Sequence, residues 1–128
     1  MTRWLSDEWC RETGDLASEL VGSPALSARI QIEVTGGPEG DVSYHRVVEE
    51  GRLVATSLGR IEHPDLTLTV DWDDARELNT GAVDPSVAFM RGRMKVAGSM
   101  ASLVDVLRLT ATPEYRDLRR RSVERTQF

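Results

Sequence analysis

The chain has 128 residues, which is enough for one domain with a modest core, and we expect residues 1–128 to form a single domain. Its net charge of −5 excludes a broad nucleic-acid-binding surface, which needs an excess of positive charge. No apolar run approaches the roughly 20 residues of a membrane span, and the start, MTRWLSDEWC, lacks the apolar core of a secretion signal. With Cys10 as the one cysteine, an internal disulfide is excluded, and we expect a cytoplasmic protein.

The first predicted element is a helix. Ser6 is placed to cap it, and apolar residues recur at helical spacing from Leu5 to Leu20. Gly14 weakens the middle of this helix, and Gly22-Ser23-Pro24 is expected to end it.

A run of strands follows, recognised by alternating apolar and polar residues. The five strands are expected at residues 30–34, 43–49, 52–58, 66–70 and 93–97. Residues 35–41, TGGPEGD, are expected to form a turn-rich loop. Glu50-Gly51 predicts a tight hairpin in which Glu49 faces Arg52 and Val48 faces Leu53.

The remaining elements are predicted helices. Asp71 leads into a short helix that ends near Gly81, and Asp84-Pro85 starts another that Gly92 stops. Residues 100–111 and a last segment starting at Thr112-Pro113 are also expected to be helical. Because most strands come together and most helices come together, we expect an α+β fold.

The sequence offers no metal or cofactor motif. Residues 71–74, DWDD, lack the glycine of a calcium loop, so we interpret them as a helix N-terminus rich in carboxylates. His45 and His63 have no metal-ligand spacing to each other or to Cys10. Gly92 and Gly98 bracket Lys95 but do not form a phosphate-binding loop, and they are better explained as a helix stop and a turn. We therefore expect neither metal nor cofactor.

The stretch from Met90 to Ala111 favours a different kind of site. The helix at 100–111 is apolar around most of its circumference, which indicates burial on more than one side. Met90, Met94 and Met100 add flexible side chains suited to a pocket for varied apolar ligands. The residues alone leave two interpretations open, an ordinary core and a pocket wall.

A catalytic function is the alternative to binding. Asp71, Asp73 or Asp105 could act as a base on an apolar substrate, although no Gly-x-Ser-x-Gly motif for a nucleophile is present. The basic run Arg119-Arg120-Arg121 is interpreted as a solvated face in preference to a contact with anionic lipid headgroups. A third interpretation is a non-binding structural or dimerisation module.

Residues 66–109 resemble the sterol carrier protein 2 family. The shared pattern is the strand LTLTV, a short helix ending at Gly81, then DPSVAFMRGRMKVAG from Asp84 to Gly98. The resemblance implies an α+β fold with a five-stranded, mostly antiparallel sheet, helices packed on one face, and an apolar tunnel between them. It also implies a lipid-binding protein without catalysis, taking a fatty acyl chain, acyl-CoA or sterol.

The resemblance assigns candidate residues to the tunnel wall. They are Leu68, Val70, Phe89, Met90, Met94, Val96, Met100, Leu103, Val104 and Leu107. In lipid carriers of this family an apolar C-terminal segment often closes the tunnel, whereas residues 113–128 are mostly charged here. Closure is therefore expected to be poor or to need a homodimer partner. A weak contact with a membrane is left open.

Overall fold

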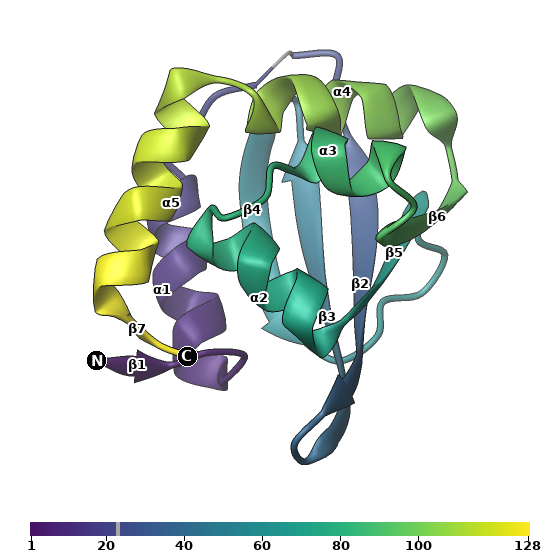
Figure 1. Cartoon of the computed structure of the whole chain (residues 1–128). Helices are drawn as coiled ribbons and strands as arrows, with labels where there is room; N and C mark the ends of the chain where they lie inside the picture. The colour runs from purple at the N-terminus through teal and green to yellow at the C-terminus, as the bar shows by residue number, and fades with distance from the viewer. Residues whose placement is uncertain (23) are drawn as a thin grey trace.

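The computed structural model describes residues 1–22 and 24–128 and contains a five-stranded sheet with the helices on one face (Figure 1). The strands are β2 (Ala28–Gly37), β3 (Gly40–Glu49), β4 (Arg52–Leu58), β5 (Leu66–Asp71) and β6 (Met94–Gly98), in the order β4-β3-β2-β5-β6. Only the β2–β5 pairing in this sheet is parallel. The predicted α+β fold with a mostly antiparallel sheet is therefore confirmed.

The two hairpins differ in how well the sequence anticipated them. Between β3 and β4, Glu49 pairs with Arg52 and Val48 with Leu53, as predicted. Glu50 (φ 51°) and Gly51 (φ 81°) both adopt the left-handed backbone that such a tight turn needs. The predicted loop at 35–41 was wrong, because β2 and β3 stay paired through a bulge as far as Gly37 and Gly40 and leave only a short turn between them.

The helices are α1 (Asp7–Ala17), α2 (Trp72–Thr80), α3 (Pro85–Met90), α4 (Met100–Thr110) and α5 (Pro113–Arg125). Several begin at a polar cap, as the sequence predicts. The Trp9 backbone N–H donates to Ser6 Oγ at 3.1 Å, and the Asp74 N–H donates to Asp71 Oδ1 at 2.8 Å. Asp84 precedes α3 as expected but makes no capping hydrogen bond, since its carboxylate contacts arginines of α5 instead.

The end of α1 differs from the prediction. The helix runs unbroken through Gly14, which faces Thr56 of β4. It ends at Ala17, before the predicted stop at Gly22-Ser23-Pro24, and Ser23 lies outside the described residues. Leu20 is consequently not part of the helix, although it still lines the interior.

The chain termini form a two-stranded parallel pairing that the sequence did not predict. β1 (Thr2–Arg3) pairs with β7 (Thr126–Gln127), so the ends of the chain lie side by side (Figure 1). Trp4 then packs on Trp72 of α2, with ring centroids 4.6 Å apart, and on Phe128 at 5.4 Å. This aromatic cluster fixes the end of α5 beside α1 and α2.

The core lies between the sheet and the helices. Along β2, β3 and β5, every second residue points toward the helices, and the buried ones include Ile30, Val34 and Leu66. Gly98 ends β6 at φ 111°, where an added Cβ would collide with the Asp65 carbonyl oxygen. Within the described residues, no helix is both long and apolar enough to cross a bilayer.

Candidate functional site

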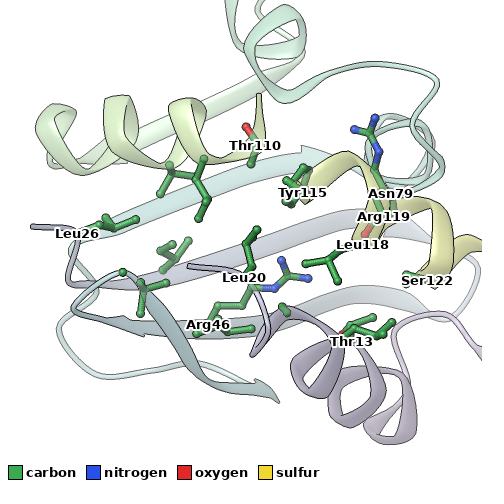
Figure 2. A pocket seen from close by; sticks show the side chains of 18 of the residues that line it. Thr13, Leu20, Leu26, Arg46, Asn79, Thr110, Tyr115, Leu118, Arg119 and Ser122 are labelled. Carbon is green, nitrogen blue, oxygen red and sulfur yellow. The ribbon is translucent and has the colours of Figure 1, made fainter. Parts of the chain in front are cut away.

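Two adjoining cavities lie between the sheet and the helices. The first cavity, of about 140 Å³, is bounded by α1, the inner face of β3, and α5 (Figure 2). The second cavity, of about 130 Å³, lies toward β5 and α2. The residues that line both are Ile30, Arg46, Asn79, Val106, Thr110 and Tyr115. Because they share these lining residues, the two cavities lie directly beside each other.

The walls are predominantly apolar. The first cavity is lined by aliphatic and aromatic side chains that include Trp9, Leu16, Leu20, Leu26, Val48, Leu53, Leu109 and Leu118. The second is lined by a similar set that includes Ile32, Tyr44, Leu68, Val70, Leu78, Met94, Leu103 and Leu107. Such a surface suits an apolar ligand, with a few polar groups left to orient it.

The structure divides the predicted wall residues into three groups. Those that line the second cavity are Leu68, Val70, Met94, Leu103 and Leu107. Phe89 and Val96 pack against the core without lining either cavity. Met90, Met100 and Val104 are 81%, 56% and 43% exposed and lie on the outer side of α3 and α4.

The interpretation of residues 100–111 as buried on more than one side was wrong. Only one side of α4 faces the interior, where Leu103 is 1% exposed and Val106 borders both cavities. Met100 and Val104 face outward. The apolar residues around α4 therefore include some that line the interior and others that are exposed on the outer side. Periodicity alone cannot separate these two environments.

Walls contributed by α1 and α5 were missed in the sequence. From α5, Tyr115, Leu118, Arg119 and Ser122 line the first cavity, and Leu118 is buried (Figure 2). One narrow apolar stripe among many charges is enough for a helix that faces the site on one side, so this charged segment does contribute to the wall of the first cavity. The expectation that it closes the site poorly or needs a homodimer partner stays a prediction. The spacing from Tyr115 to Leu118 to Ser122 was the available signal.

The basic run of α5 is neutralised by acidic neighbours instead of forming a free solvated face. Arg119 reaches Asp84 at 3.5 Å, and its guanidinium lies 5.8 Å from the centre of the Tyr115 ring. Arg120 contacts Asp117 at 2.7 Å, and this guanidinium lowers the pKa of the Asp117 carboxyl through its hydrogen bond and charge. The run therefore offers little free positive charge.

Arg46 is the polar side chain that sequence analysis overlooked. It comes from β3, between Tyr44 and Val48 on the inner face, and it borders both cavities. Its guanidinium lies among the lining side chains in Figure 2. The signal was present in the strand alternation, which places an arginine at a position where the neighbouring inward residues are apolar.

The wall carries little acid–base chemistry. Burial raises the pKa of the Tyr44 hydroxyl and of the Cys10 thiol, so both groups stay neutral near pH 7. Neither cavity is lined, among the described residues, by aspartate, glutamate, histidine or cysteine. The candidate bases lie elsewhere: Asp71 caps α2, and Asp105 sits 4.0 Å from Arg108.

No group of three or more potential metal-ligating side chains comes together within the described part of the chain. His45 Nδ1 contacts the Gly59 carbonyl oxygen at 2.9 Å, and His63 lies in a loop. His45 therefore has a structural contact with a neighbouring loop, and neither histidine belongs to such a group.

Comparison with known proteins places this architecture in a family. The model of the SCP-2 sterol transfer family matches residues 18–110, and the chain belongs to that family. Membership supports a lipid-binding or sterol-transfer role. A sequence search of curated proteins finds no match.

Solved structures share the fold at low sequence identity. A possible sterol carrier protein from Thermus thermophilus is 17% identical with a TM-score of 0.76, covering 92% of this chain and 88% of that one. A crystal structure of sterol carrier protein 2 is 15% identical with a TM-score of 0.73, covering 91% and 97%. A palmitated SCP2L2 from Aedes aegypti is 13% identical with a TM-score of 0.63, covering 84% and 92%.

Proposed function

We propose that this protein binds and carries a lipid with a long apolar chain, a fatty acid, acyl-CoA or sterol, in the two adjoining cavities. The observation that carries the proposal is the position of these apolar cavities between the sheet and α1, α4 and α5. Each cavity alone is smaller than the roughly 300 Å³ at which ligand pockets begin. Because the two cavities share lining residues, we propose that a single lipid chain extends through both. The palmitated neighbour from Aedes aegypti supports a fatty acyl ligand.

Binding without chemical conversion is the function that the wall favours. General acid–base catalysis needs a titratable group within reach of the substrate. Among the described residues, the lining of the two cavities supplies no carboxylate, imidazole, amine or thiol, which are the usual general acids and bases besides tyrosine. We therefore propose a carrier in preference to an enzyme that uses Asp71, Asp73 or Asp105. We also propose that the protein is a single domain and that it acts in the cytoplasm.

Titration with a fluorescent fatty acid tests this function. We expect saturable binding at one site per chain, with an affinity that is near micromolar at best. Burial of about 300 Å² of acyl chain contributes roughly 7 kcal/mol before the cost of ordering is subtracted. Native mass spectrometry of the purified protein should also detect a copurified lipid. A linear, non-saturating signal up to the solubility limit of the probe would leave a structural module as the function.

A carrier must exchange its ligand, and we propose that it does so at an anionic bilayer through the outer side of α3 and α4. Val87, Met90, Met100 and Val104 are exposed there, and Arg91, which directly follows α3, is an exposed cation nearby. Apolar side chains beside a cation suit a membrane surface with anionic headgroups.

Replacing both Met90 and Met100 with aspartate is expected to slow lipid transfer to phosphatidylserine vesicles at least about fivefold, because charge is placed where apolar contact is needed. Stopped-flow transfer of a fluorescent fatty acid measures the rate. Val54→Asp is the control, since Val54 is 54% exposed but lies on β4, at the opposite edge of the sheet from β6. If the double variant transfers normally and instead splits a wild-type dimer in sedimentation, this surface is a homodimer interface.

A further inference from the structure

Arg46 is a cation built into the wall of an apolar site. In β3, Tyr44 and Val48 point inward on either side of it and are buried. Ile30, which pairs with Arg46 on the adjacent strand β2, also faces the helices. An arginine is expected at such a position only when something there compensates its charge, because a lone charge in apolar surroundings is unfavourable.

No such partner is found in the part of the chain that the structure describes. Arg46 Nε is buried without a hydrogen-bond acceptor, and no ion pair or hydrogen bond joins the Arg46 guanidinium to another residue there. Among the described residues, its one specific contact is with the Tyr44 ring, whose centre lies 5.8 Å from the guanidinium carbon. Tyr44 and Cys10, the ionisable groups that interact with Arg46, are neutral.

Other partly buried arginines show how this chain normally compensates such charges. Arg93 Nε donates to Asp74 Oδ1 at 2.7 Å, and Arg93 also contacts Glu77. Arg119, which lines the first cavity, pairs with Asp84. Arginine keeps its charge throughout the pH range in which proteins are folded, so Arg46 cannot be relieved by losing a proton. The missing partner is therefore best supplied by a ligand.

The chemistry of a guanidinium limits the ligand to one with a compact oxyanion. Arginine binds planar carboxylates through two parallel hydrogen bonds, and it also binds phosphates. Tyr115 borders the same shared wall, and its hydroxyl can donate a further hydrogen bond to such a head group. Thr110 Oγ1 and Asn79 Nδ2 already donate to the Leu107 and Ala75 carbonyl oxygens. Because Arg46 borders both cavities, a head group bound to it lies inside the protein with an apolar tail beside it.

We propose that Arg46 binds the carboxylate of a free fatty acid, and that this contact selects the acid over sterols, alcohols, esters and coenzyme A thioesters. The inference rests on the proposed lipid-binding function and narrows its ligand class. A sterol or alcohol carries no charge to pair with Arg46. An acyl-CoA has a neutral thioester at the corresponding position, so that group also carries no charge to pair with Arg46.

Calorimetry with ligands that have the same apolar tail and different head groups measures what the head group contributes to the affinity. We expect the wild type to bind dodecanoate roughly tenfold to a hundredfold more tightly than dodecanol, the range given by charge-assisted hydrogen bonds. Arg46→Met should abolish this preference by weakening dodecanoate alone, and its apo form should melt no lower than the wild type. Arg29→Met is the matched control, since Arg29 lies on the adjacent strand and is exposed. It should keep the preference.

Each other outcome has a defined meaning. Equal binding of dodecanoate and dodecanol by the wild type, or an unchanged preference in Arg46→Met, overturns this inference and leaves lipid binding intact. Dodecanoyl-CoA binding as tightly as dodecanoate also overturns it. Titration with dodecyl phosphate tests whether Arg46 prefers a phosphate to a carboxylate. If dodecyl phosphate binds more tightly than dodecanoate, the assignment to a fatty acid is wrong. Absence of binding by all these lipids overturns the proposed function together with the inference.

Discussion

Replacing Leu66 with alanine is expected to lower the free energy of unfolding by about 2–5 kcal/mol, near the upper end of that range. Leu66 is 0% exposed in the middle of the sheet, where it pairs with Ile30 of β2 and Gly98 of β6. It lines neither cavity, so truncation would open a new void in a packed region. Urea denaturation followed by tryptophan fluorescence measures the loss.

Leu68 provides a matched control on the same face of β5. It lines the second cavity, so part of its surface already lacks packing partners. Leu68→Ala should therefore destabilise the apo protein less than Leu66→Ala, by roughly 1–2 kcal/mol, while weakening lipid binding. Equal destabilisation by the two substitutions would mean that the second cavity is filled by rearranged side chains in solution.

Replacing Val106 with tryptophan is expected to reduce lipid affinity by more than about tenfold and to leave the apo protein folded. Val106 is on α4 and borders both cavities, so a larger side chain there occupies the space that a ligand needs. Overpacking of a filled core typically costs about 1–3 kcal/mol, but a cavity accommodates the added volume at less strain. Titration with a fluorescent fatty acid and a thermal melt measure the two effects.

Val104→Trp is the control for this experiment. It makes the same change two residues earlier on the same helix, but Val104 is 43% exposed and lines neither cavity. We expect unchanged lipid affinity. If Val104→Trp blocks binding and Val106→Trp does not, the ligand occupies the outer side of α4, and the proposed location in the cavities is wrong.

Local patterns in the sequence predicted most of the fold. Strand alternation identified the strands, and Ser6, Asp71 and Thr112 marked helix starts that the structure confirms. The hairpin at Glu50-Gly51 was predicted down to its register. These features depend on residues that are close together in the sequence, so they can be predicted from the sequence alone. The pairing of Thr2–Arg3 with Thr126–Gln127 joins opposite ends of the chain and has no such local signal.

The location of the site depended on the tertiary structure. Within the helix at residues 100–111, the sequence could not decide that Leu103 and Leu107 face a cavity while Met100 and Val104 face outward, because apolar residues surround the helix. Residues 113–128 are the reverse case, because their many charges concealed Leu118, which lines the first cavity.

Arg46 shows most clearly where local information ends. Its place in the alternation of β3 could be read from the sequence, and this alone makes it an inward-facing arginine. Whether such an arginine is paired depends on which acidic side chains other elements bring near it, as the start of α3 brings Asp84 to Arg119. The sequence by itself determined most of the elements, their order and the family pattern. Long-range packing alone decided which side chains enclose a cavity and which charge within it lacks a partner.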